Sequence, residues 1–124
     1  MKILIVDDSE TFRIWIAELI TCYCRTPEMK HAASVAEGIQ FSLEFKADAV
    51  LLDLGLPDGM GWDVLKEIRK NPRPVLVIVL TNYSSDQFRQ RALKEGADYF
   101  LDKSDDFEKA MLILKEEEKH LGPS

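Results

Sequence analysis

The chain has 124 residues, of which 46% are hydrophobic and 31% charged, and its formal net charge is −6 at pH 7. This length suits one domain with its own core, and the composition is that of a globular protein rather than a disordered tail. The acidic balance and the lack of a basic tract argue against a general nucleic-acid binder, because nothing is predicted to neutralise phosphates.

The sequence also bears on where the protein works. No stretch is long and apolar enough to span a bilayer, and the N-terminus lacks a signal-peptide pattern. Cys22 and Cys24 lie two residues apart, which does not fit a metal site, and there is no distant cysteine to pair with them. We interpret both as reduced thiols that pack in the fold, and we expect a cytoplasmic protein without membrane insertion.

Strands and helices are predicted to alternate from the N-terminus onward. The apolar run Lys2–Val6 predicts a buried strand, and Ser9 suits the N-cap of a helix that ends at about Cys22. Met29–Ala33 indicates a weak edge strand. Apolar residues recur at helical spacing on one side of the first helix, with Ile14 on the other side: Phe12, Trp15, Ile16, Leu19 and Ile20.

The middle of the chain repeats this alternation. Ser34, with Glu37 three residues later, has the pattern of a capping box and opens a predicted helix to about Phe45. A buried strand is predicted over Asp48–Leu52, and the turn-rich segment Leu54–Gly61 predicts a loop.

Two further helices frame the most apolar segment. A helix is predicted over Trp62–Lys70, and Val75–Leu80 predicts a central strand because it is uniformly apolar. Ser84 or Ser85 then caps a helix that runs to Glu95, with Gly96 as its C-terminal stop.

The last two elements complete the pattern. A strand is predicted over Asp98–Leu101 and a helix over Asp105–His120, with Asp105 and Glu108 suited to capping it. Five strands alternating with five helices predict a three-layer α/β sandwich around a parallel sheet, in one domain spanning residues 1–124.

Polar residues follow four of the five predicted strands. Asp7 and Asp8 come after the first strand, Asp53 after the third, Thr81 after the fourth and Lys103 after the fifth. Ligands of such sheets bind beyond the carboxyl ends of the strands, where these side chains would meet. Three clustered carboxylates repel one another unless a hard divalent cation lies between them, so we expect a Mg²⁺ site.

Four segments in this order closely resemble the receiver domain of two-component response regulators, over nearly the whole chain. They are Val6–Ser9, Leu52–Gly59, Leu80–Asn82 and Gly96–Lys103. The resemblance implies a five-stranded sheet in the flavodoxin-like order 2-1-3-4-5 and a phosphorylation-activated signalling switch rather than an enzyme.

The resemblance also implies a role for each site residue. Asp53 would be the nucleophile that accepts a phosphoryl group as an acyl phosphate. Asp8 would bind Mg²⁺ directly and Asp7 often through water, and an oxygen of Asp53 and the backbone carbonyl of Gly55 would complete the protein ligands.

Three further residues would sense the phosphoryl group. Lys103 would place a mobile ammonium on one phosphoryl oxygen, and Thr81 would donate its hydroxyl to another. Phe100 occupies the aromatic switch position and is expected to turn inward when Thr81 moves. Because Phe100 has no hydroxyl that needs a partner, we expect its inward form to be populated without phosphate.

Partners follow from the same resemblance. A histidine kinase or a histidine phosphotransfer protein would supply the phosphoryl group, and Ile14 is expected to face this donor. No DNA-binding or enzymatic domain follows the predicted receiver, so the output is expected to pass through protein contacts. The face of the fourth helix, fifth strand and fifth helix, with Leu112 exposed on it, would bind an effector or a second copy of the chain.

Two other classes of function stay open. A receiver-like module could act only as an interaction surface, but degenerate receivers usually lack an acidic residue or the lysine, and this chain keeps both. A phosphohydrolase of the haloacid-dehalogenase type would need Asp-x-Asp after the first strand, which Asp7-Asp8-Ser9-Glu10 does not supply.

The chain departs from the family pattern at two places. Ser104 follows Lys103 where the family usually has a proline with a cis peptide bond, and we predict a trans bond because a cis bond before a non-proline residue costs about 3–4 kcal/mol. Asn82 and Tyr83 after Thr81 are larger than usual and are predicted to narrow access to the site. Tyr83 is therefore expected to slow hydrolysis of the acyl phosphate.

Overall fold

A computed structural model of the protein describes residues 1–122. Its main sheet is parallel and five-stranded, and its strands stand in the order β2-β1-β3-β6-β7. The strands of this sheet are β1 (Lys2–Val6), β2 (Glu28–Ala32), β3 (Ala49–Leu52), β6 (Leu76–Thr81) and β7 (Tyr99–Asp102). A two-stranded hairpin follows β3 and consists of β4 (Gly55–Leu56) and β5 (Gly59–Met60).

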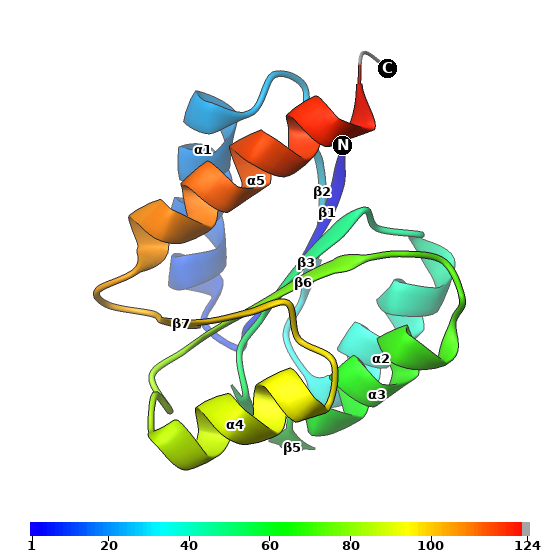
Figure 1. The fold of residues 1–124 in the computed structure, drawn as a ribbon, viewed down its shortest axis with the longest axis vertical. Helices are drawn as coiled ribbons and strands as arrows, with labels where there is room; N and C mark the ends of the chain where they lie inside the picture. Colours follow the sequence, from blue (N-terminus) through cyan, green and yellow to red (C-terminus); the bar gives the residue numbers. More distant parts are fainter. Residues whose placement is uncertain (123–124) are drawn as a thin grey trace.

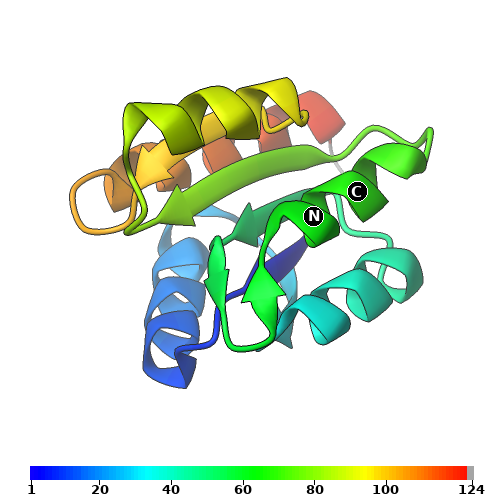
Figure 2. The ribbon, with the colours of Figure 1, turned by 90° about the horizontal axis from the view of Figure 1, so that it is seen from below.

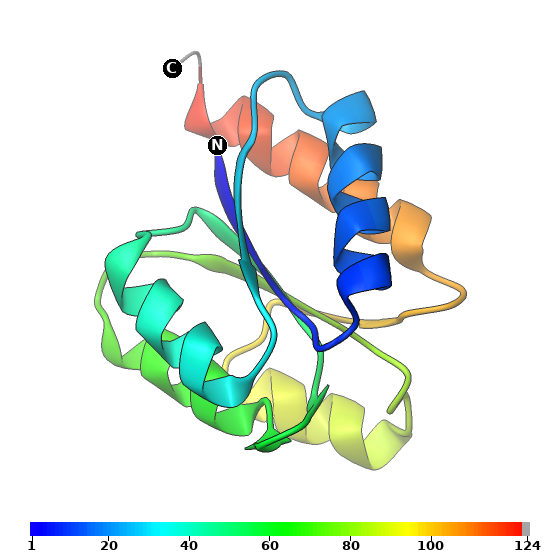
Figure 3. The same ribbon diagram turned by 180° about the vertical axis from the view of Figure 1, so that it is seen from behind.

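Helices cover both faces of the sheet. Along the chain they are α1 (Glu10–Tyr23), α2 (Val35–Glu44), α3 (Trp62–Lys70), α4 (Asp86–Lys94) and α5 (Phe107–Leu121). The helices α1 and α5 lie on one face, and α2, α3 and α4 lie on the other (Figures 1 and 3). The predicted three-layer sandwich is confirmed. Its strand order is the predicted 2-1-3-4-5 once the small hairpin is left out of the numbering.

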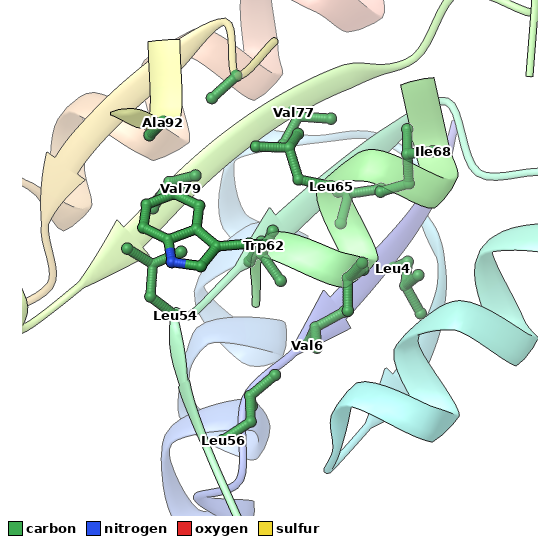
Figure 4. Close-up of a cluster of buried hydrophobic side chains, with 14 of the residues drawn as sticks. Leu4, Val6, Leu54, Leu56, Trp62, Leu65, Ile68, Val77, Val79 and Ala92 are labelled. Atoms are coloured by element: carbon green, nitrogen blue, oxygen red, sulfur yellow. The ribbon is translucent and has the colours of Figure 1, made fainter. Parts of the chain in front are cut away.

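Alternating strand residues feed two hydrophobic cores. On β1, Ile3 and Ile5 point toward α1 and α5, whereas Leu4 and Val6 point toward the other three helices, and each side chain is at most 1% exposed. Trp62 of α3 packs among apolar side chains of several elements in the core that faces α2, α3 and α4 (Figure 4). Each fully buried Ile, Leu or Val side chain contributes about 1.5–3 kcal/mol to stability.

Serine caps start three of the helices as predicted. The hydroxyls of Ser9, Ser34 and Ser85 accept hydrogen bonds from backbone N–H groups three residues later, at 3.1, 3.1 and 3.3 Å. Gly96 follows the C-cap of α4 and terminates that helix with a φ of +108°, a conformation that favours glycine. These local signals set the positions at which the chain leaves and re-enters the sheet.

Several expectations about the elements were wrong. The fifth helix begins at Phe107 rather than Asp105, because Asp106 instead accepts a hydrogen bond from the Asp102 N–H at 2.9 Å and Asp105 lies in the turn. The strand β6 is interior, but β3 takes the central place in the sheet. The predicted loop over Leu54–Gly61 contains the short hairpin, drawn in green in Figure 2.

Two side chains predicted to pack in the core are partly or fully accessible. Trp15 is 42% exposed and instead joins an aromatic surface cluster with Phe12 and Phe107, at ring distances of 5.8 and 5.1 Å. Both cysteines are free, as expected, but only Cys24 is buried, whereas Cys22 faces solvent. Within residues 1–122, no helix has the length and apolarity that crossing a bilayer requires.

Candidate functional site

The carboxyl ends of neighbouring strands bring the predicted acidic residues together. Asp7 follows β1 and Asp53 follows β3, and both extend the ladder of the sheet by one residue. The Asp7 N–H donates to the Ala32 carbonyl at 3.0 Å, and the Asp53 N–H donates to the Val6 carbonyl at 2.9 Å. These backbone bonds hold the two side chains at one edge of the sheet.

Three carboxylates form a cluster at this edge. Asp7 and Asp53 are 2% and 8% exposed, whereas Asp8 is open to solvent. One carboxylate oxygen from each of the three lies within 4.8 Å of the others, close enough to share one cation. Hard oxygen donors in this number fit Mg²⁺, which binds through a few carboxylates and keeps several waters.

Lys103 balances part of this negative charge. Its Nζ lies 2.6 Å from Asp7 Oδ2 and 3.2 Å from Asp53 Oδ2, and its side chain is only 12% exposed. The ammonium also lies 4.3 Å from the centroid of the Phe12 ring, which favours a cation at that point. Three carboxylates and one ammonium leave an excess of two negative charges, the charge that a divalent cation neutralises.

The buried charges shift one another's titration. Burial raises the pKa of Asp7, and the hydrogen bond from Lys103 offsets this only in part. Burial by itself lowers the pKa of Lys103, but the hydrogen bonds and negative charges of Asp7 and Asp53 outweigh it, so the pKa of this ammonium is raised. Lys103 is therefore charged at neutral pH, as contact with a phosphoryl anion would require.

Thr81 and Phe100, which belong to neighbouring strands of the sheet, are both buried. Thr81 ends β6 and is fully buried, and its hydroxyl donates to Asp53 Oδ1 at 2.7 Å. Phe100 of β7 is 2% exposed, so its ring occupies the inward position. Arg89 of α4 places its guanidinium 5.2 Å from the centre of that ring and donates to the Phe100 carbonyl at 3.2 Å.

The turn that carries Lys103 forms without a proline. The Lys103–Ser104 peptide bond is trans, as predicted. Asp102 Oδ1 accepts hydrogen bonds from the N–H groups of Ser104 and Asp105 at 2.8 and 3.0 Å, and the Lys103 N–H donates to the Thr81 carbonyl at 2.9 Å. These bonds aim Lys103 into the site.

Tyr83 lines one side of the site. Its ring packs edge-on against Phe88 at 5.7 Å and lies against Gly55, where a Cβ would come within 2.5 Å of Tyr83 Cε2. A side chain at position 55 would displace the ring of Tyr83 from this contact. The Gly55 N–H lies 3.4 Å from Asp53 Oδ1, so the Gly55 backbone is held beside the acidic cluster.

Sequence reasoning missed Arg13 and gave no separate role to Asp58. Arg13 Nη1 donates to the Asp7 carbonyl, and its spacing of three and seven residues from Ile16 and Ile20, on the core stripe of α1, was a readable signal. Asp58 accepts from the N–H groups of Val35 and Ala36 at 2.7 and 3.1 Å, so it supports the start of α2 and lies outside the acidic cluster.

Comparisons with known proteins agree with this geometry. The sequence profile of the response regulator receiver domain matches residues 3–115. The chain is 32% identical over 101 residues to the response regulator protein VraR of Staphylococcus aureus, covering 82% of this chain and 48% of that protein. It is 33% identical over 105 residues to a protein-glutamate methylesterase/protein-glutamine glutaminase of Hahella chejuensis, covering 84% of this chain and 27% of that protein.

Solved structures show the same fold. The signal receiver domain of a LuxO repressor protein from Vibrio parahaemolyticus superposes with a TM-score of 0.85 at 28% identity, covering 96% of this chain and 90% of that chain. A CheY-like receiver domain from Methanospirillum hungatei gives 0.80 at 28% identity, covering 96% and 97%. The chain spans less than half the length of the two curated relatives named above. By profile, fold and site geometry, this chain belongs to the response regulator receiver domain family.

Proposed function

We propose that this receiver domain is a phosphorylation-activated switch, which accepts a phosphoryl group on Asp53 from a histidine kinase or a histidine phosphotransfer protein with Mg²⁺ bound. One observation carries this proposal: the Asp53 carboxylate contacts both the Thr81 hydroxyl and the Lys103 ammonium, within a cluster of three carboxylates. A receiver-like module that served only as an interaction surface would not need this convergence of costly buried charges.

The proposed transfer step uses these contacts. An oxygen of Asp53 attacks the phosphorus in line as the bond to the donor imidazole breaks, and the electron pair of that bond stays on the imidazole. The Lys103 ammonium and the Thr81 hydroxyl, which now contact the two Asp53 oxygens, would bond to phosphoryl oxygens instead.

Four groups of this chain would hold the metal. They are the carboxylates of Asp7, Asp8 and Asp53 and the backbone carbonyl of Gly55. Bound Mg²⁺ supplies positive charge that offsets the repulsion between the carboxylates and the incoming phosphoryl anion. Lys103 alone leaves the cluster with excess negative charge, so phosphorylation is expected to require the metal.

Labelling with acetyl phosphate tests this proposal. Intact-mass spectrometry is expected to show one added phosphoryl group with Mg²⁺ and none with EDTA, and Asp53→Ala should abolish the label. Asp63→Asn, at an exposed aspartate of α3, is the matched control. Full labelling of Asp53→Ala would disprove the assignment. Rapid turnover without a stable label would favour a phosphohydrolase, and no label at all would favour a phosphorylation-independent module.

We infer that donor and output partners use different faces. Ile14 on α1 is 49% exposed and lies in the helix that follows the acidic pair, whereas Leu112 on α5 is 59% exposed and faces away from the core. Phe100, which would couple Asp53 to the output, lies in β7 between α4 and α5. Because histidine kinases use cytoplasmic ATP, we expect the chain to act in the cytoplasm.

Two charge substitutions separate the faces. Leu112→Glu is expected to weaken effector binding or dimerisation while phosphorylation by a donor kinase continues at the normal rate. Ile14→Glu is expected to slow transfer from the kinase while leaving labelling by acetyl phosphate and output binding unchanged. If both substitutions impaired the same step, this division of faces would be wrong.

A further inference from the structure

Arg13 is a buried cation in a place where α1 otherwise packs apolar side chains. It is 9% exposed and belongs to the stripe of α1 that also buries Ile16 and Ile20. The ion pairs found within residues 1–122 do not include Arg13, and its buried Nε has no hydrogen-bond partner there. Burying an unpaired charge is costly, and the buried hydrogen bond of Arg13 Nη1 offsets part of that cost.

That hydrogen bond reaches the acidic loop. Arg13 Nη1 donates to the carbonyl of Asp7, which belongs to the peptide group between Asp7 and Asp8. The other side of Asp7 is held as well, because its N–H donates to Ala32 and its carboxylate accepts from the Ser9 N–H at 2.8 Å. The Asp7–Asp8 peptide is thereby fixed, and its plane sets the direction in which Asp8 leaves the backbone.

Asp8 depends on this backbone more than its neighbours do. The carboxylates of Asp7 and Asp53 are held by Lys103, and Asp53 also by Thr81, but Asp8 is exposed and receives no side-chain bond within residues 1–122. Its oxygen nevertheless lies within the 4.8 Å cluster. The fixed Asp7–Asp8 peptide is therefore what places Asp8 for a metal.

We propose that Arg13 is a positioning residue of the metal site: its guanidinium holds the peptide between Asp7 and Asp8 so that Asp8 is presented to Mg²⁺. This inference rests on the proposed function, because it takes the acidic cluster as the Mg²⁺ site of phosphorylation. It adds a residue of α1, outside the acidic cluster and outside the predicted ligands, to the groups that determine metal affinity.

The charge of Arg13 and its hydrogen bond have opposite effects on Mg²⁺. A positive charge beside the site repels a cation, so a purely electrostatic role predicts tighter Mg²⁺ binding when the charge is removed. A positioning role predicts weaker binding, because Asp8 loses its fixed direction. Partners that orient metal ligands typically contribute about 10–100-fold to affinity. The sign of the change therefore separates the two roles.

Two neutral variants isolate the hydrogen bond. Arg13→Met removes both charge and donor, whereas Arg13→Gln removes the charge and keeps an N–H donor on a shorter side chain. Titration calorimetry with Mg²⁺ is expected to show a Kd raised about tenfold in Arg13→Met and raised less in Arg13→Gln. Arg25→Met, at an exposed arginine just after α1, should leave the Kd unchanged.

A second measurement guards against a trivial loss of fold. Far-UV circular dichroism verifies that each variant is folded, and NMR of the Asp8 amide reports the loop directly. We expect this amide to become mobile in Arg13→Met while amides of β6 stay unperturbed. If Arg13→Met does not fold, Arg13→Gln carries the test alone. An unchanged or lowered Kd in the folded variant would overturn the inference.

Failure of this inference is distinguishable from failure of the proposed function. If the wild-type protein is labelled on Asp53 but Arg13→Met binds Mg²⁺ as tightly as wild type, only the role of Arg13 is wrong. If the wild type binds Mg²⁺ and Arg13→Met weakens it, but Asp53 is never labelled, the role of Arg13 stands and the proposed phosphoacceptor is wrong.

Discussion

The two ends of the parallel sheet treat their carboxylates differently. At the amino ends of the strands, Asp48 accepts from the Lys2 N–H at 2.8 Å and pairs with Arg73 at 3.1 Å. Asp98, just before β7, likewise accepts from a backbone N–H at 2.8 Å and pairs with an arginine at 3.0 Å. At the carboxyl ends, Asp7 and Asp53 share the single cation Lys103, and the clustered Asp8 beside them pairs with no cation within residues 1–122.

Carboxylates with compensated charge therefore differ in role from carboxylates whose charge is not compensated. A carboxylate with its own arginine and its own backbone donor has its charge compensated and ties two segments together. The carboxylates at the other end are undercompensated, so the fold tolerates a repulsion that a bound cation relieves. Such local instability is typical of functional sites, where activity and stability make opposing demands.

The largest expected effect is on the rate of Asp53 phosphorylation, which should depend on Lys103 at the carboxyl end of the sheet and not on Arg73 at the amino end. Lys103→Met should slow phosphorylation of Asp53 by acetyl phosphate about hundredfold, the usual effect of removing one group that stabilises charge in the transition state. Arg73→Met, at the amino end, should leave that rate unchanged and lower only the stability. Labelling time courses at saturating Mg²⁺ measure both. Similar rates for the two variants would remove the distinction between the ends.

A smaller, several-fold effect is expected at the exposed Tyr83 and none at the exposed Tyr99. Tyr83 lies against Gly55 beside the acidic cluster, and we expect its ring to exclude the water that would attack an acyl phosphate in line. Tyr83→Ala should shorten the lifetime of phosphorylated Asp53, whereas Tyr99→Ala, near the amino-end Asp98, should not. Decay of the labelled protein after removal of the donor gives both lifetimes, and an unchanged or longer lifetime in Tyr83→Ala would count against this role.

The smallest expected effect is on the free energy of unfolding, and it differs between carboxylates of the two ends. Asp48→Ala should lower the free energy of unfolding by about 1 kcal/mol, because it leaves the Lys2 N–H and Arg73 without their partner. Asp8→Ala should leave it unchanged or raise it, because the substitution removes repulsion within the acidic cluster. Urea unfolding without Mg²⁺ measures both. Equal losses in the two variants would show that both ends serve stability alone.

Local signals in the sequence were sufficient for most of the secondary structure. The caps Ser9, Ser34 and Ser85 act through groups only a few residues away, so their effect does not depend on the rest of the fold. The start of α5 was misplaced because a competing local hydrogen bond forms in the turn before it. The Asp106 carboxylate accepts from the Asp102 N–H four residues earlier, so Asp105 stays in the turn and the helix begins at Phe107.

Burial was harder to predict than helix position. Trp15 of α1 has the spacing of a core residue, but its ring packs against Phe107, the first residue of α5, and stays 42% exposed. Cys22 was expected to pack, and it lies on the exposed side of α1. Helical periodicity indicates which side a residue faces, but how far the neighbouring helix covers that side depends on how the helices pack.

By itself the sequence determined the class of fold and predicted which side chains meet at the carboxyl edge of the sheet. Apolar strands that alternate with capped helices permit few topologies, and the ends of parallel strands place Asp7, Asp53, Thr81 and Lys103 at one edge. Only the tertiary structure decided how these residues are held. The Lys103 N–H donates to the Thr81 carbonyl and the Lys103 ammonium contacts Asp7 and Asp53, so its position depends on bonds between segments that meet only after the sheet has formed.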